Sequence, residues 1–503
     1  MREGGAELRM GSSCVIELCC SRCGSLCTVR TSEKTGIIHT GFDINRRIVA
    51  AATASGMGFA QTKRFFAHLS MPQPMNEKTF HFYKGRINAG VNRAANKHLQ
   101  KAAEQVRAAY ADMNIGIPDR NGILNISISI DGTWQKRGRT SHNGVVTVIE
   151  ILTGLVVDFI AMSNFCQMCE TGPQPDDDSY DQWWEGHKNK CQKNIDCSSA
   201  AMEVEGARAI FKRSVQLHGF RYTEMLGDGD AKTHAALLAE DPYGGYPIEK
   251  IDCVNHVTKR LGTALRNLVQ TRKAQHAPIH GRGKLTEERI KKLTNYYGRA
   301  IKDNSGDLEA MERAVWASFF HTMSADENHN HTLCPTGLQS WCFFQRAQAE
   351  NVAPRPHSKS LPPDVAEALD PVYKRLGDPQ LLRRCLAGKT QNSNECFHSL
   401  LWSMCPKERW ASLRTVDTAL GISVQRFNKG STATADILVE LELMTSRCTE
   451  LYAEQEDLAR VQSATRKNSN KEREKRKRID IVRRRERQDR QGREGEVYGP
   501  GQF

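Results

Sequence analysis

The sequence contains no apolar run of the roughly 18 residues that a membrane-spanning helix requires. The nearest candidate, residues 144–162, is interrupted by Glu150, Gly154 and Asp158, a pattern typical of two strands joined by a turn. No apolar segment with a small-residue cleavage site stands near the N-terminus, so we expect neither a membrane protein nor a secreted one. The sixteen cysteines are then expected in a reducing compartment, where clustered Cys and His residues indicate metal binding before disulfides.

Internal repeats are absent, and the basic residues are concentrated at one end of the chain. The formal charge of the sequence is +13, and residues 466–493 hold fourteen Lys and Arg against five Asp and Glu, a balance of +9. Such a run is typical of a nuclear-import signal, of a nucleic-acid contact or of the exposed end of a helix. We expect a nuclear protein and keep these three interpretations of the run open.

Hydrophobic periodicity predicts an α/β fold with a mixed sheet. From Leu124 the apolar residues alternate, which predicts three strands at 125–131, 144–151 and 155–163 in an antiparallel meander. A helix, a strand, a helix, a strand and a helix follow between residues 203 and 273. Three antiparallel strands followed by α-β-α-β-α describe the ribonuclease H-like plan.

These elements divide the chain into six segments, one of which contains a small zinc-type loop insertion. In chain order the segments are a Cys-rich N-terminal segment (1–42), a helical leader (43–120), a ribonuclease H-like core (121–283) with the zinc-type insertion (163–200), a mainly helical insertion (284–389), a final core helix with a third acid (390–425), and a helical and then basic C-terminal tail (426–503).

Two of the predicted strands end in an acid. Asp131 ends the first strand and Asp228 ends the fourth, and because the middle strands of such a sheet lie side by side, we expect both carboxylates at one sheet edge. Carboxylates held together repel each other unless a cation lies between them, and oxygen ligands suit Mg²⁺ or Mn²⁺. Two such ions can activate an attacking water or 3′-hydroxyl and stabilise a leaving oxygen. Glu395, which shares a predicted helix face with His398 and Trp402, is the candidate third acid.

Other acids compete for these positions. An Asp followed by Gly at a strand end is most often a turn former. Asp230 competes with Asp228, and we favour Asp228 because it directly follows the apolar end of the strand, which leaves Asp230 as a turn or N-cap residue. Glu150 and Asp158 lie within strands, and Asp252, beside the tip of the fifth strand, is the more serious rival.

An ordered series of short motifs runs through residues 40–425. In chain order it reads DGTWQKRG, NGVVTVI, CQMCE, EGARAIF, LGDGDAK, CVNHVTKRLG and NSNECFHSLLWSMCPK. This series resembles the Mutator-like transposase domain of eukaryotic cut-and-paste DNA transposons. The resemblance implies a ribonuclease H-like core with an Asp-Asp-Glu triad at Asp131, Asp228 and Glu395, and it matches Cys253 and His256 to the C-x2-H element of the family.

The resemblance also implies a reaction and its partners. It implies a transposase that uses Mg²⁺ or Mn²⁺ to hydrolyse a DNA strand at the transposon ends and then joins the freed 3′-hydroxyl to target DNA. The partners are double-stranded DNA and a second copy of the chain, because transposases pair two ends; no membrane partner is expected. Two alternatives stay open: a ribonuclease H-like nuclease without strand transfer, and a transposon-derived, zinc-stabilised nuclear DNA-binding protein that has lost catalysis.

Two groups of Cys and His residues have the spacing of zinc ligands. C-x2-C and H-x3-C pairs each place both donors on one turn of the chain, which suits a tetrahedral Zn²⁺. We expect zinc bound to the first group to stabilise an insertion that lacks regular structure, and we expect His321 or His329 to supply a further ligand to the second group. The first group is Cys166, Cys169, His187 and Cys191; the second is His331, Cys334 and Cys342. Cys253 and His256 alone are too few for zinc and are expected to brace the core by hydrogen bonding.

Cationic residues follow the predicted acids. Contacts with DNA phosphates and solvated loop charges both explain them. Gly132 is expected to let the chain leave the strand without crowding a bound ion, and we interpret Trp134 as a packing residue before a base-stacking one. The candidate DNA-contacting residues are Lys136, Arg137, Arg139, Lys259 and Arg260.

Overall fold

The computed structural model describes residues 2–3, 11–35, 41–136, 140–228, 231–281, 283–357, 360–476, 478–479, 482 and 486. The chain falls into two compact units. The first comprises residues 1–52, 59–94 and 425–503, and the second comprises residues 53–58 and 95–424. Within the described residues, no helix has both the length and the apolar character needed to cross a membrane.

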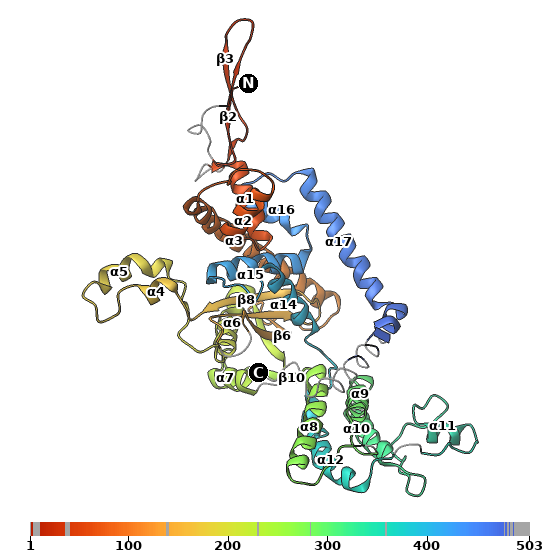
Figure 1. Ribbon diagram of the computed structural model, residues 1–503. Helices are drawn as coiled ribbons and strands as arrows, with labels where there is room; N and C mark the ends of the chain where they lie inside the picture. Colours follow the sequence, from red (N-terminus) through yellow and green to blue (C-terminus); the bar gives the residue numbers. More distant parts are fainter. Residues whose placement is uncertain are drawn as a thin grey trace. The chain divides into compact units, whose positions relative to one another are not determined.

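A mixed five-stranded sheet lies at the centre of the second unit (Figure 1). β6 (Leu124–Trp134) pairs antiparallel with β7 (Asn143–Glu150), and β7 pairs antiparallel with β8 (Val156–Ser163). On its other side β6 runs parallel to β9 (Phe220–Gly227), and β9 runs parallel to β10 (Glu249–Asp252). The predicted mixed α/β sheet is therefore confirmed, with the first and fourth of its strands as neighbours.

Alternate residues of β6 face opposite sides of the sheet, as in any strand. The isoleucines at 126, 128 and 130 are buried in a core shared with α6 (Met202–His218). Ser129 and Thr133 point the other way and bind side chains of α14 (Asn392–Met404). Helices α6 and α14 thus cover opposite faces of the sheet, as Figure 1 shows.

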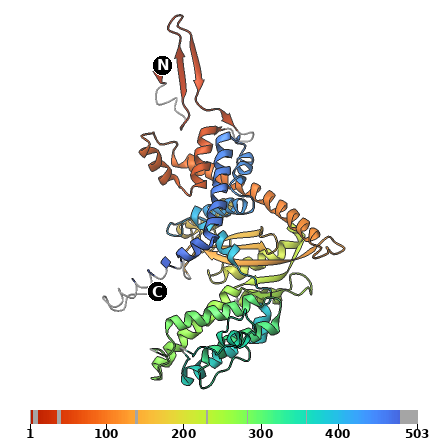
Figure 2. The same ribbon diagram turned by 90° about the vertical axis from the view of Figure 1, so that its right-hand side faces the viewer.

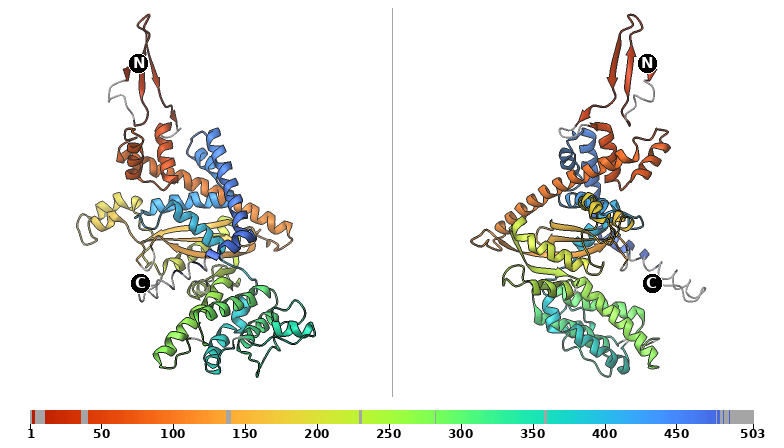
Figure 3. Two further views of the ribbon diagram at one scale, coloured as in Figure 1. Left: turned by 45° about the vertical axis from the view of Figure 1, so that its right-hand side comes forward. Right: turned by 90° about the vertical axis from the view of Figure 1, so that its left-hand side faces the viewer.

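Between β10 and α14 the chain builds a helical bundle, drawn in green to teal in Figures 2 and 3. Its core contains fully buried side chains from five helices, among them Leu261, Tyr297, Val315, Tyr373 and Leu382. The helices are α8 (Val254–Ala274), α9 (Glu287–Asp303), α10 (Leu308–Met323), α11 (Phe343–Ala349), α12 (Pro363–Leu376) and α13 (Pro379–Arg384).

The segment after β8 differs from its prediction. Residues 163–200 were expected to lack regular structure, but they contain α4 (Gln167–Thr171), α5 (Tyr180–His187) and the 3₁₀ turn η2 (Lys188–Lys190). The aromatic residues of α5 supply the physical reason, because the Trp183 ring stacks on His187 with centroids 4.5 Å apart. The second unit is completed by α7 (Ala231–Glu240) and most of α15 (Leu413–Lys429).

The first unit is mainly helical. Its core contains the fully buried Val49, Phe80 and Val91, and Arg93 donates a hydrogen bond of 2.8 Å to the main-chain oxygen of Glu440. The β2–β3 hairpin is largely exposed. The elements are β1 (Arg2–Glu3), β2 (Val15–Cys19), β3 (Leu26–Arg30), β4 (Lys34–Thr35), β5 (Gly41–Phe42), α1 (Asp43–Ala54), α2 (Phe59–His68), the first half of α3 (Glu77–Asp112), α16 (Ala433–Glu440) and α17 (Arg447–Asn468).

Candidate functional site

Asp131 lies within β6 and not at its tip, so this part of the prediction is wrong. The reason is that β6 continues three residues past Asp131 and pairs with β7 as far as Trp134, which lies opposite Gly144. On the side of β9, however, the pairing ends at Ser129 and Leu226. Asp131 and Asp228 each lie two residues beyond that last pair, so the two acids stand at the same level on adjacent parallel strands.

Helix α14 is fixed to this part of β6 by hydrogen bonds from one helix face. Gln391 donates to the main-chain oxygen of Ile130 at 2.9 Å, and Asn394 binds the hydroxyl of Ser129 at 2.6 Å. About two turns further on, the indole of Trp402 donates to the hydroxyl of Thr133 at 2.9 Å. These contacts bracket Asp131 and place the first turn of α14, which carries Glu395, beside it.

The start of α8 completes the arrangement. His256 Nε2 lies 3.9 Å from Oε1 of Glu395, and Arg260 donates to the main-chain oxygen of Asp228 at 3.1 Å. The main-chain N–H of Cys253 donates to the oxygen of Gly227 at 3.1 Å. The hydrogen-bonding role predicted for the C-x2-H pair fits these contacts, since Cys253 Sγ also accepts from the N–H of Gln391 at 3.4 Å.

The carboxylates act on one another. Burial, together with the charges of Glu203, Asp228 and Glu395, raises the pKa of Asp131 to about 8. The structure therefore brings the three predicted acids together, and it adds a fourth. A carboxyl group in such surroundings is mostly protonated at neutral pH unless a cation compensates its charge.

Glu203, in the first turn of α6, is the acid that the sequence analysis missed. A Cβ added to Gly132 would lie 3.0 Å from Oε2 of Glu203, so Glu203 can approach the strand because residue 132 has no side chain. Gly132 was expected to leave room for a bound ion, whereas its near neighbour is this side chain of α6. An acid in a helix's first turn is ordinary, so only the three-dimensional packing reveals Glu203.

His398 lies on the same side as Asp131. Its Nδ1 atom is 3.7 Å from Oδ2 of Asp131. Burial, and then the charge of Lys407, lowers the pKa of His398 to about 4, so the ring is neutral at physiological pH. A neutral imidazole offers one donor and one acceptor, which makes His398 a polar, uncharged wall of the acid cluster.

Three of the rival acids are engaged elsewhere. The carboxylate of Glu150 accepts hydrogen bonds from the hydroxyl of Tyr110 and from the turn that follows β7. Asp158 pairs with Arg213 at 2.5 Å, and the buried Asp252 pairs with Arg384 at 2.9 Å. Asp230 lies outside the described residues, so the structure does not compare it with Asp228.

The candidate DNA-contacting residues divide into two groups. Arg137 and Arg139 lie outside the described residues, whereas Lys136 is exposed at the end of β6. Lys259 and Arg260 line a cavity of about 790 Å³ that also includes Asp228 and His256. Trp134 packs against the core of the sheet and donates to the main-chain oxygen of Ser199 at 2.8 Å, as the packing interpretation predicted.

The first Cys/His group forms a compact cluster. The ligand atoms of Cys166, Cys169, His187 and Cys191 lie within 4.8 Å of one another. Cys169 Sγ is 3.2 Å from Nε2 of His187 and 3.5 Å from Sγ of Cys191. Ligands on a tetrahedral Zn²⁺ with bonds of ~2.0–2.3 Å are separated by roughly 3.3–3.8 Å, so this donor set fits zinc. The structure thus brings together all four residues that the spacing predicted.

The second group is also a four-residue cluster, and the structure selects its fourth member. The ligand atoms of His321, His331, Cys334 and Cys342 lie within 4.8 Å of one another. The last turn of α10 delivers His321, whereas the ring of His329 packs on Phe344, with centroids 4.6 Å apart. The set of two imidazoles and two thiols again fits zinc.

A hydrogen-bonded chain orients His331 in this second cluster. Its Nδ1 atom faces the cluster, 3.5 Å from Cys342 Sγ, while its Nε2 atom lies 2.9 Å from Nε2 of His357. The Nδ1 atom of His357 is 2.7 Å from Oδ1 of Asp326. When the proton of His357 is on Nδ1, the Nε2 atom of His357 accepts a hydrogen bond from the Nε2–H of His331. The Nδ1 atom of His331 then carries no proton and can bind a metal.

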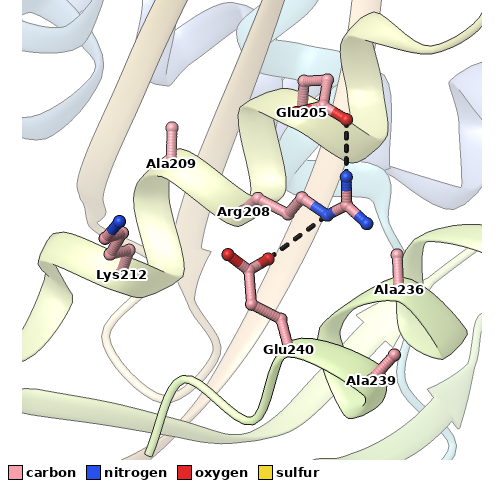
Figure 4. Close-up of a pocket in the computed structure, with 7 residues that line it drawn as sticks. All are labelled: Glu205, Arg208, Ala209, Lys212, Ala236, Ala239 and Glu240. Atoms are coloured by element: carbon pink, nitrogen blue, oxygen red, sulfur yellow. Dashed lines mark hydrogen bonds and ion pairs between the residues drawn. The ribbon is translucent and has the colours of Figure 1, made fainter.

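A shallow pocket between α6 and α7 is separate from these groups (Figure 4). Its central guanidinium, that of Arg208, lies 2.7 Å from Glu205 and 3.2 Å from Glu240. Because both carboxylates already hold it, we assign no ligand to this pocket.

Comparison with known proteins agrees with the resemblance seen in the motifs. Residues 2–342, about two thirds of the chain, match the family described as Mutator-like transposase. The matched range contains Asp131, Asp228 and both Cys/His clusters, and Glu395 lies beyond it. No curated protein gives a significant match to the chain. On the strength of the family match, the chain belongs to the Mutator-like transposase family.

Proposed function

We propose that the protein is a DNA transposase with a ribonuclease H-like core, in which Asp131, Asp228 and Glu395 form an Asp-Asp-Glu triad. Membership of the family implies a DNA-binding enzyme of the nuclease and transferase type. The observation that supports the triad is the convergence of these acids from β6, from the end of β9 and from α14. Burial, and then the charges of Glu203, Asp228 and Glu395, raises the pKa of Asp131 to about 8.

The donor set suits Mg²⁺ or Mn²⁺. All the donors are carboxylate oxygens, which these hard cations prefer, and the side chain of Glu395 is 58% exposed, so a substrate can reach it. When bound, the ions would activate the attacking water or 3′-hydroxyl and stabilise the leaving oxygen. Glu203 would add negative charge to the cluster from the side of α6.

The histidines at the site would position the acids. His256, whose pKa burial and Lys259 lower, approaches Glu395 from α8. His398 borders Asp131 from α14 without adding charge. Both rings would hold their acids in place by hydrogen bonds or dipoles without competing with a cation, because neither is protonated at neutral pH.

A basic cavity next to the acids supports DNA as the substrate. Beyond Asp228 it is lined by Lys259, Arg260, Arg375 and Arg384, and by the polar side chain of Asn267. We propose that the phosphates of the strand next to the cleaved bond follow this surface, with Lys136 on the other side of Asp131. Lys and Arg contacts of this kind fix the position of a strand and make binding depend on salt.

The two Cys/His clusters would bind structural Zn²⁺. Each is a complete set of four soft or borderline donors with no position left open for a substrate. The first would fasten α4 to the end of α5, and the second would fasten the end of α10 to the loop that precedes α11.

The test is a cleavage and strand-transfer assay on DNA that carries the terminal repeats flanking the gene. With Mg²⁺ or Mn²⁺ we expect nicked ends and joined products from the wild-type protein and neither from Asp131→Ala or Glu395→Gln. Glu249→Gln, an exposed acid on β10, is the matched control and should retain activity.

Other outcomes would redirect the proposal. Cleavage without joining would indicate a nuclease. Binding of the repeats without cleavage would indicate a transposon-derived DNA-binding protein. Full activity of Asp131→Ala would refute the triad.

We also propose that the protein acts in the nucleus, with the basic run at 466–493 as its import signal, and that it pairs two DNA ends as a homo-oligomer. Fusion of residues 460–503 to a cytosolic reporter would test the first point. Light scattering of the protein with and without end DNA would test the second.

A further inference from the structure

The helical bundle contains a second cavity that the acid cluster does not use. It has a volume of about 920 Å³ and lies between α9, α10 and the loop at 332–341. Its lining combines two aromatic side chains, Tyr296 and Trp341, with the guanidinium groups of Arg299 and Arg313. Asp303 is the acid in the lining, so the charge of the lining is positive.

The aromatic pair presents an open stacking surface. The rings of Tyr296 and Trp341 are nearly parallel, at 26°, with centroids 6.3 Å apart. Trp341 is 50% exposed, so much of its surface is available for contact with a ligand. Lys292 adds a positive charge 5.5 Å from the centroid of Tyr296.

The second Cys/His cluster holds this surface in place. Trp341 directly precedes the cluster residue Cys342, and its ring meets His321 edge-on at 4.9 Å. The hydroxyl of Ser340 accepts from the N–H of Cys342 at 3.1 Å and donates to the oxygen of Pro335 at 2.5 Å. The loop is therefore anchored at the cluster, and a Trp fixed in this way can stack on a ligand with little loss of its own rotamer freedom.

We propose that this cavity binds an unpaired nucleotide of single-stranded DNA, with the base on Trp341 and Tyr296 and the phosphates on Arg299 and Arg313. Planar aromatic surface flanked by cationic side chains is the arrangement that recognises single strands, because every base has a flat face and every link carries a negative charge. The proposal rests on the proposed function for the choice of DNA, and it requires no catalysis.

The test is binding of fluorescein-labelled (dT)₁₂ to the full-length protein, followed by anisotropy without added Mg²⁺ or Mn²⁺. We expect Trp341→Ala to bind about 5- to 100-fold more weakly than wild type and Trp341→Phe to recover most of the loss. Arg299→Ala should lower the slope of log K against log salt by about 0.7. Leu338→Ala, an exposed apolar residue of the same loop, is the matched control and should bind like wild type.

Two further measurements make the result decisive. Equal zinc content in wild type and Trp341→Ala shows that the cluster is intact, so a loss of binding is then due to the missing ring. Unchanged binding by Trp341→Ala would overturn the proposal, as would equal competition by a blunt duplex or by free dTMP. If the protein binds (dT)₁₂ through Trp341 but does not cleave DNA, the proposed transposase activity is wrong and the proposed nucleotide site is not affected.

Discussion

Replacing Asp131 with Asn should stabilise the protein in the absence of divalent cations. The pKa of Asp131 rises from 3.8 to about 8 on folding, first through burial and then through Glu203, Asp228 and Glu395. A carboxyl whose pKa is higher in the folded state favours folding most at low pH. That stability is lost as the pH rises from about 4 to about 8, because the unfolded chain ionises first.

The size of the effect follows from the same values. One pKa unit is equivalent to about 1.4 kcal/mol, so at pH 7 the buried acid costs up to about 4 kcal/mol relative to a neutral side chain. The carboxylate is 21% exposed, and solvation reduces this to about 2–4 kcal/mol. Asn is neutral at every pH, so the Asp131→Asn protein should lack this part of the pH dependence.

Asp252→Asn is the matched control with the opposite sign. Asp252 is a buried strand-end acid on β10, but its carboxylate pairs with Arg384 at 2.9 Å. Removing one partner of such a pair leaves the other without compensation, so we expect a loss of about 1–3 kcal/mol. The comparison separates acids that repel one another from an acid held in an ion pair.

The assay is hydrogen exchange of peptides that span β6 and β7, measured from pH 5 to 9 at constant ionic strength. Added Mg²⁺ should remove most of the difference in stability, since an ion that binds only the folded wild type at 100 times its Kd adds about 2.7 kcal/mol, which is comparable with the cost of the buried charge. A destabilised Asp131→Asn protein, or one with the pH dependence of wild type, would refute the reasoning.

Three further outcomes are expected. Asp326→Ala should leave the fold intact and weaken zinc retention by the second cluster about 10- to 100-fold. The reason is that it breaks the hydrogen-bonded chain that orients His331. Zinc release to a chelating dye measures this, and unchanged release would contradict it. Gly132→Ala should be destabilising alone and nearly neutral in a Glu203→Ala background, with a coupling of about 1 kcal/mol in a denaturation cycle; additive effects would argue against the contact. Trp402→Phe should cost about 1 kcal/mol through the lost bond to Thr133, seen as faster exchange in α14, and equal protection would contradict it.

The sheet was predictable because its signal is local. The isoleucines of β6 alternate with polar residues, and the pattern directly reports a strand with one face in the core. The pairing of β6 with β9 followed from the order of elements. The extent of β6 beyond Asp131 was not predictable, because the alternating isoleucines end at Ile130 and residues 132–134 belong to the strand through their pairing with β7.

The site was predictable in part for a similar reason. Asp131 and Asp228 follow predicted strands, which marks them in the sequence, and Glu395 shares a predicted helix face with His398 and Trp402. Glu203 carries no such mark, because its position depends on the packing of α6 against Gly132. His321 could be separated from His329 only by the direction in which α10 ends.

The contacts of Cys253 have a consequence for how this family can change. The bundle leaves the sheet at Cys253, whose N–H binds Gly227, and returns beside it, where Gln391 binds the sulfur and Lys389 accepts from the next residue, Val254. The chain therefore enters and leaves the bundle at one point. Adding residues between these two ends costs little chain entropy and does not move the acids. Evolution can therefore lengthen or shorten the bundle beyond the first turns of α8, which belong to the site, while the acids keep their positions.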